Sequence, residues 1–176
     1  MKRLLLAAAS LLIAGPTLAQ TVILVRHAEK VDASADPALS EAGQRRAFDL
    51  AVALSDADLT HVFTSPLQRT VLTGRLAAEA HAINPEAISF EGGTEAHIQR
   101  VAERIRALPD DAVVLVVGHS NTVPLIARAL GESGPSEMAD CEYDRLTVIS
   151  VEDDGDSPAV ISRYGAPANC EHNISG

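Results

Sequence analysis

An arginine and a histidine stand together where an apolar run of the chain ends. Arg26 and His27 directly follow residues 21–25, a run typical of a buried strand. A guanidinium group can hold phosphate oxygens with paired hydrogen bonds, and an imidazole can act as a nucleophile. Because open α/β sheets bind ligands at the carboxyl ends of their strands, this placement predicts an anion site.

Two later segments carry the same kinds of side chain after extended runs. Residues 64–69 are Thr-Ser-Pro-Leu-Gln-Arg, and residues 117–121 are Val-Gly-His-Ser-Asn. Arg69 stays charged at any physiological pH, and His119 can donate a further hydrogen bond. Together with Arg26, these side chains predict a pocket whose positioned donors spread the charge of a phosphoryl group.

The three segments, in this order, resemble the histidine phosphatase superfamily, which has the phosphoglycerate-mutase-like fold. The family hallmark is Arg-His after the first strand, a second arginine in Ser-x-Leu-x-Arg, and a later Gly-His. The resemblance implies that His27 is the nucleophile and is phosphorylated during turnover. It also implies that Arg26, Arg69 and His119 bind the phosphate, and that no cofactor or metal is needed.

The chemistry expected from this resemblance is phosphoric monoester hydrolysis of the histidine acid phosphatase type. His27 has to be neutral to attack, so its second ring nitrogen is expected to donate to a backbone carbonyl and fix the tautomer. Attack gives a phosphohistidine, and water then releases phosphate. His119 is expected to be protonated when dianionic phosphate lies beside it.

The proton donor for the leaving group is less clearly marked in the sequence. In the family it is usually a glutamate between the second arginine and the second histidine, where Glu91 and Glu95 stand here. Glu95 is preferred because it can open a helix beside a glycine turn. Glu29 is a rival because it follows His27 closely, and some small members of the family work without a dedicated acid.

Further polar residues are predicted to line the mouth of the pocket. Lys30 would place a cation on its rim, and Glu29 lies beside it in the sequence. Ser65 could donate to phosphate, although Ser-Pro is also ordinary at the start of a helix. Ser120 could donate to phosphate as well, but capping of the following helix is the preferred role. Tyr143 either frames the pocket or is buried at its edge.

Two alternative functions follow from the same segments. Ser120 after a strand resembles the nucleophile elbow of a serine hydrolase, but that motif requires glycine where Thr122 stands. The only histidine downstream is His172, in the tail. The second alternative is a non-catalytic protein of the same fold that binds phosphate esters.

These residues require a fold that brings several strand ends together. Alternating extended and helical patterns predict a three-layer α/β/α sandwich with a mostly parallel central sheet and an antiparallel carboxyl-terminal strand pair. Residues 153–158 are predicted to form the turn of that pair. Strands are expected at residues 21–25, 61–64, 87–90, 112–117, 145–152 and 159–164, and helices at 40–54, 66–80, 95–108 and 121–130.

The amino terminus has the zones of a secretory signal peptide: Lys2 and Arg3, an apolar run, and a small-residue cleavage site after Ala19. Removal of residues 1–19 leaves 20–176 as one histidine phosphatase domain, which is expected to be periplasmic or secreted. No later stretch is apolar enough for a stable membrane insertion.

Composition limits the partners of the mature chain. Its formal charge moves from −10 to about −12 once the two leader cations are removed, and an acidic protein repels nucleic acid. A small phosphorylated substrate is the expected partner, and the oligomeric state is left open. Cys141 and Cys170 either form a disulfide or remain thiols, and with His172 they are too few for a zinc site.

Overall fold

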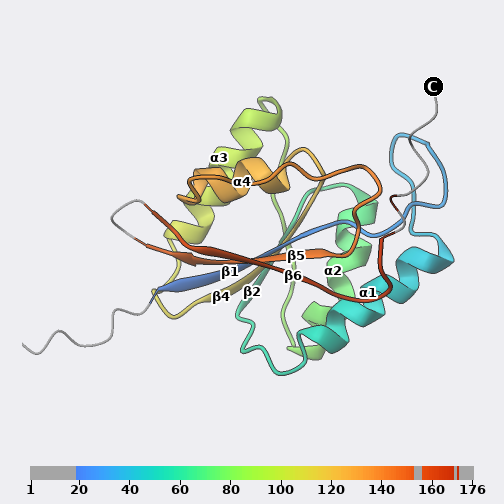
Figure 1. Ribbon diagram of the computed structural model, residues 1–176, viewed down its shortest axis with the longest axis horizontal. Coiled ribbons are helices and arrows are strands. Elements are labelled where there is room, and N and C mark those ends of the chain that lie inside the picture. Colours follow the sequence, from blue (N-terminus) through green and yellow to red (C-terminus); the bar gives the residue numbers. More distant parts are fainter. Residues whose placement is uncertain (1–18, 153–155, 169, 171–176) are drawn as a thin grey trace, which may run out of the picture.

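The computed structural model describes residues 19–152, 156–168 and 170, which form one six-stranded sheet flanked by helices (Figure 1). The strand order is β3-β2-β4-β1-β5-β6. The predicted signal peptide lies outside the described residues except for Ala19, as does part of the predicted turn at 153–158. The strands are β1 (Gln20–Arg26), β2 (His61–Thr64), β3 (Glu86–Ala87), β4 (Val113–Gly118), β5 (Arg145–Val151) and β6 (Ala159–Arg163), and the helices are α1 (Glu41–Ala53), α2 (Gln68–Ala80), α3 (Gly93–Arg106) and α4 (Val123–Ala129).

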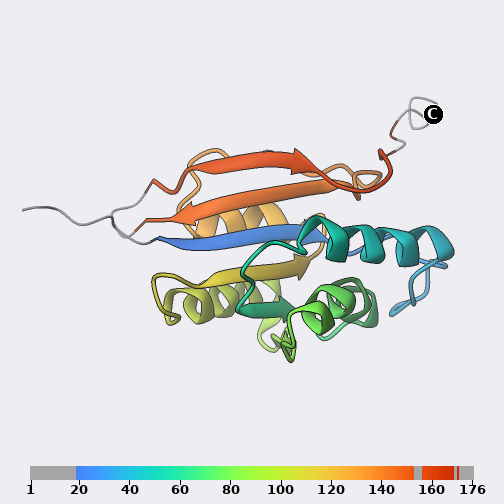
Figure 2. The ribbon, with the colours of Figure 1, turned by 90° about the horizontal axis from the view of Figure 1, so that it is seen from below.

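The sheet is parallel on one side and antiparallel on the other. Strands β1, β2, β3 and β4 run parallel, whereas β5 pairs antiparallel with both β1 and β6. Figure 2 shows α1 and α2 on one face of the sheet and α3 and α4 on the other. The predicted three-layer sandwich with an antiparallel carboxyl-terminal pair is therefore confirmed.

Alternating side chains of β1 supply the two cores between these layers. Val22 and Leu24 pack in the cluster that includes residues of α3 and α4, and Ile23 and Val25 pack in the cluster with α1 and α2. A parallel strand buried on both faces has the continuous apolar run seen in the sequence. No helix among the described residues is long and apolar enough to span a membrane.

Several element boundaries differ from the predictions. Strand β3 is two residues long and ends at Ala87, and α3 begins at Gly93 after Gly92, whose φ of 80° is left-handed. Helix α4 begins at Val123, not at Asn121, because the residues after β4 first form a turn. In that turn the Thr122 hydroxyl accepts a hydrogen bond from the backbone N–H of His119 at 2.9 Å.

Candidate active site

The carboxyl ends of β1, β2 and β4 bring two histidines together. Arg26 lies opposite Gly118 in the parallel register, and the next backbone N–H, that of His27, donates to the Gly118 carbonyl at 2.9 Å. The rings of His27 and His119 lie edge to face with centroids 5.3 Å apart. Ser65 reaches the same edge from β2, on the other side of β4.

His27 is held as a neutral imidazole. Its Nδ1 lies 2.8 Å from the carbonyl oxygen of Ala28, so this nitrogen is the one that donates. The expected backbone partner is therefore confirmed. Burial lowers the pKa of His27 to about 4, and the charges of Arg26 and Arg69 lower it further against the favourable backbone hydrogen bond. The tautomer leaves a lone pair on Nε2.

His119 is also neutral, in contrast to the protonated ring expected when phosphate is bound. Burial lowers its pKa to about 3, with further contributions from His27 and Arg69. Its Nε2 lies 3.0 Å from Ser65 Oγ, which in turn lies 2.8 Å from Thr70 Oγ1. Ser65 is fully buried, so its hydroxyl orients His119 instead of lining the mouth of the pocket as predicted.

Arg26 is clamped by the segment before β5. Its guanidinium donates to the carbonyls of Ala139 and Asp140 at 3.0 and 2.7 Å, and lies over the ring of Tyr143 at 4.2 Å. The exposed Asp140 carboxylate is 3.8 Å away. Burial lowers the pKa of Arg26, and Tyr143 and Asp140 partly offset that effect.

Arg69, in the first turn of α2, is held in a similar way by a different loop. Its guanidinium donates to the Ala35 carbonyl at 3.4 Å and lies 3.8 Å from the Asp36 carboxylate. The same carboxylate accepts from the backbone N–H of Gln68 at 2.8 Å and so fixes the start of α2. The Nε atoms of Arg26 and Arg69 are buried without a hydrogen-bond partner among the described residues. A bound oxyanion would satisfy both donors.

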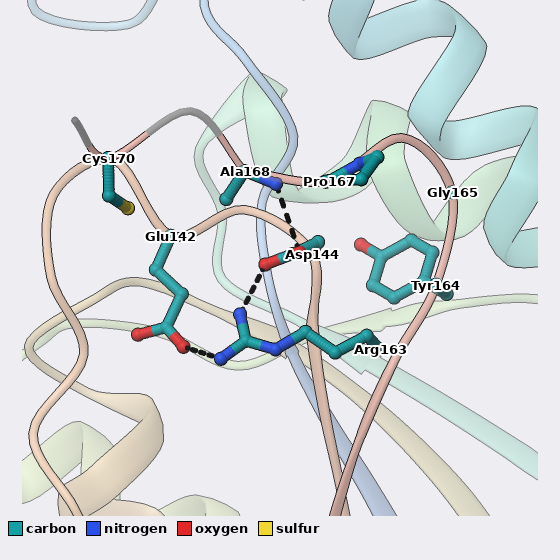
Figure 3. Close-up of a pocket in the computed structure, with 8 residues that line it drawn as sticks. All are labelled: Glu142, Asp144, Arg163, Tyr164, Gly165, Pro167, Ala168 and Cys170. Atoms are coloured by element: carbon teal, nitrogen blue, oxygen red, sulfur yellow. Dashed lines mark hydrogen bonds and ion pairs between the residues drawn. The ribbon is translucent and has the colours of Figure 1, made fainter.

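The residues that follow the segment that clamps Arg26 are anchored to the carboxyl-terminal tail. Figure 3 shows the carboxylate of Asp144, which accepts a hydrogen bond from the backbone N–H of Ala168. A disulfide joins Cys141 to Cys170 across 29 residues of chain. The Arg163 guanidinium lies between the carboxylates of Glu142 and Asp144, at 2.9 and 2.6 Å. Of the two states left open for the cysteines, the disulfide is the one present.

Glu29, predicted to be a substrate ligand or a rival proton donor, is bound to another residue in the structure. Its carboxylate forms an ion pair with Arg46 of α1 at 2.7 Å. Arg46 also donates to the carbonyls of Tyr164 and Ala166, so Glu29 belongs to a contact between α1 and the tail. This partner could not be predicted from the sequence, because only the packing of α1 brings Arg46 to Glu29.

Three other predicted residues are exposed, and none of them hydrogen-bonds either histidine. Glu95 is exposed on α3 and accepts a hydrogen bond from Gln99 one turn later. Lys30 is exposed, and its backbone bridges to Leu39. Glu91 is exposed as well. No group of three metal-ligating side chains occurs in the part of the chain that the structure describes.

Asp140 and Phe90 lie near the site but were not predicted to belong to it. Ser120, predicted as a phosphate ligand or nucleophile, donates a hydrogen bond to Asp140. Phe90, treated only as part of a strand, lies 5.9 Å from the ring of His119. Tyr143 does frame the pair, with its ring 6.1 Å from that of His27.

The two depressed histidine pKa values predict a loss of stability in acid. An unfolded histidine binds a proton near pH 6.5, whereas His27 and His119 stay neutral until about pH 4 and 3. The stability is therefore intact above pH 6.5 and falls below it, by about 2 kcal/mol per histidine at pH 5. Urea unfolding at pH 8 and pH 5 measures the difference. A substitution of either residue by Gln should reduce this pH dependence, and an unchanged dependence in both variants would contradict it.

The disulfide is predicted to stabilise both the fold and the Arg26 clamp. Replacement of Cys141 and Cys170 by Ser should lower the free energy of unfolding by about 3 kcal/mol, given a closed loop of 29 residues. Phosphate binding, measured by calorimetry, should weaken several-fold because the segment that holds Arg26 loses an anchor. Ser162→Ala on exposed β6 serves as the control. Unaltered stability in the double variant would refute the prediction.

The sequence comparison identifies one family. Residues 22–90 match the model of the histidine phosphatase superfamily (branch 1), and this segment includes Arg26, His27 and Arg69. No curated protein matches the sequence.

Solved structures share the fold at low sequence identity. The protein histidine phosphatase SixA, complexed with tungstate, has a TM-score of 0.64 and 18% identity over 81% of this chain and 96% of its own. Mycobacterial glucosyl-3-phosphoglycerate phosphatase has a TM-score of 0.62 and 16% identity over 85% and 100%. Bacillus stearothermophilus YhfR has a TM-score of 0.60 and 17% identity over 82% and 96%. Residues 22–90 thus resemble the histidine phosphatase superfamily, and the solved structures share the fold of most of this chain.

Proposed function

We propose that this protein is a phosphatase that hydrolyses a phosphomonoester through a phosphohistidine intermediate on His27. The observation that carries the proposal is the His27 ring itself: a buried imidazole with Nδ1 bound to the Ala28 carbonyl and a pKa lowered to about 4. Phosphatases among the similar structures support the same activity, and two of those structures hold tungstate or vanadate.

The phosphoryl group would be bound by the two arginines. Arg26 and Arg69 each carry a buried Nε–H without a partner in the described residues. A terminal nitrogen of each guanidinium donates to a backbone carbonyl of a loop remote in sequence, Asp140 for Arg26 and Ala35 for Arg69. The donors are therefore fixed before the substrate arrives. Such preorganised donors stabilise the negative charge that builds up during phosphoryl transfer.

The reaction would proceed in two displacements. The Nε2 lone pair of His27 attacks phosphorus, and the bond from phosphorus to the leaving oxygen breaks with its electron pair going to that oxygen. Water then attacks the phosphohistidine, and phosphate leaves as His27 regains its lone pair. His119, oriented by Ser65, lies beside the transferred group, and the charge of bound phosphate raises the pKa of its ring.

The decisive test is substitution of the proposed nucleophile. His27→Ala should reduce kcat for 4-nitrophenyl phosphate by at least about a thousandfold, because the other imidazole of the pair, His119, has its Nε2 bound to Ser65. Brief incubation with ³²P-labelled substrate followed by alkaline quenching should leave label on the wild-type protein only. His61→Ala, at the start of β2, is the matched control and should retain both activity and label.

Two outcomes would count against the proposal. Activity and labelling that survive in His27→Ala would exclude this residue as the nucleophile. A wild-type protein that binds phosphate and hydrolyses no activated phosphate ester would favour the non-catalytic binding protein of the same fold.

We also propose that the protein is exported and acts in the periplasm or outside the cell. The pattern of residues 1–19 is the basis, and the disulfide between Cys141 and Cys170 supports it because such bonds persist in oxidising compartments. The expected mature protein begins at Gln20. Mass spectrometry of the protein purified from the cell envelope or the medium tests this, and an intact Met1 in that fraction would contradict cleavage.

A further inference from the structure

Two of the few aromatic residues of this chain stand beside the histidine pair. The sequence contains three Phe, two Tyr and no Trp. Phe63 and Tyr164 are buried in the cores, and Phe48 is exposed on α1. The remaining two, Phe90 and Tyr143, are half-buried and flank the candidate active site. Because the protein has so few aromatic residues, the presence of two of them beside the histidines suggests that they contribute to substrate binding.

Each of these rings is fixed by a side chain behind it. The guanidinium of Arg26 lies over the Tyr143 ring at 4.2 Å. The ring of Phe90 stacks on that of His97 at 4.1 Å, and His97 is itself buried with Nδ1 3.3 Å from the Ser89 carbonyl. Both rings are therefore held in place while part of their surface stays accessible. A fixed, half-exposed ring provides contact area at a small entropic cost.

The rings lie on opposite ends of the histidine pair. Tyr143 is 6.1 Å from His27, and Phe90 is 5.9 Å from His119. The two histidines are 5.3 Å apart, so the rings are neighbours in the order Tyr143, His27, His119 and Phe90, which we call the row. A phosphoryl group bound between the histidines would have its leaving group next to one or both of the outer rings.

Two carboxylates close to the site in sequence or space each lie beside an arginine. Glu29 is paired with Arg46, and Asp140 lies 3.8 Å from Arg26 and accepts from Ser120. Among the described residues, no carboxylate hydrogen-bonds either histidine of the pair. A leaving group that departs here without general acid catalysis has to be stable as an anion.

We propose that the substrate is an aryl phosphate, whose aromatic leaving group packs against Phe90, with Tyr143 closing the other end of the row. This inference rests on the proposed phosphatase function. The bond between phosphorus and the aryl oxygen breaks as the bond to His27 Nε2 forms. Its electron pair stays on the aryl oxygen, where the ring delocalises the charge until solvent protonates the product.

The test compares two good leaving groups, only one of which is aromatic. Phenyl phosphate and acetyl phosphate are assayed with the wild type, and the ratio of their kcat/KM values is recorded. In Phe90→Leu this ratio should fall about tenfold, the size of one lost aromatic contact. The intrinsic difference in reactivity between the two substrates cancels, because only the change in the ratio is used.

Two further variants make the result specific. Phe90→Tyr keeps a ring and should retain the wild-type ratio, which separates loss of the ring from loss of folding. Phe48→Leu makes the same substitution on an exposed ring of α1 and should also leave the ratio unchanged. Thermal unfolding of each variant confirms that it is folded.

The possible failures are distinguishable. If the wild type hydrolyses both substrates and Phe90→Leu keeps the ratio within twofold, the aromatic leaving-group site is overturned and the phosphatase function stands. If Phe90→Tyr loses the ratio as fully as Phe90→Leu, ring contact is not its cause and the inference fails. If the wild type hydrolyses acetyl phosphate but not phenyl phosphate, the aryl substrate is overturned and the phosphatase function stands. If it hydrolyses neither of these nor 4-nitrophenyl phosphate, the proposed function falls, and this inference falls with it.

Discussion

The candidate site depends on an electrostatic constraint: two guanidinium groups and two imidazoles share one buried edge of the sheet. Arg26 and Arg69 cannot lose their protons at any physiological pH. The imidazoles of His27 and His119 can, and burial together with the arginine charges keeps both neutral. The same environment that gathers donors for an anion therefore also leaves His27 with the lone pair that a nucleophile needs.

The register of the sheet brings Arg26, His27 and His119 close together. Arg26 and Gly118 are paired across β1 and β4, and the backbone hydrogen bond from His27 to Gly118 continues the ladder by one residue. His27 and His119 are therefore fixed by main-chain geometry, which side-chain substitutions disturb little. The arginines are long and flexible by comparison, and each is held by a backbone carbonyl and an aspartate from a loop remote in sequence.

The features that depend on the local pattern of apolar and polar residues could be predicted from the sequence. The apolar runs that became β1 and β4 predicted the sheet edge at which Arg26, His27 and His119 lie. The helix predicted at residues 66–80 carries Arg69 in its first turn, as α2 does. Glu29 was misjudged because nearness to His27 in sequence says nothing of Arg46, which packing supplies. Phe90 was not recognised, because an aromatic residue at the end of the strand predicted at 87–90 is ordinarily part of a hydrophobic core. Only the structure shows that its ring lies beside His119.

Asp36 and Asp140 would also affect how tightly the site holds a phosphate ion. Asp36 and Asp140 each lie 3.8 Å from one of the phosphate-binding candidates, on the more exposed side of the guanidinium. Each carboxylate reduces the net positive charge that a phosphate ion meets, and does so without occupying the buried Nε donors. Two unscreened arginines would hold inorganic phosphate more tightly and slow its release. In the proposed phosphatase, the pairing of each arginine with an exposed aspartate would favour release of phosphate, while the buried Nε donors would stay free to bind the transferred group.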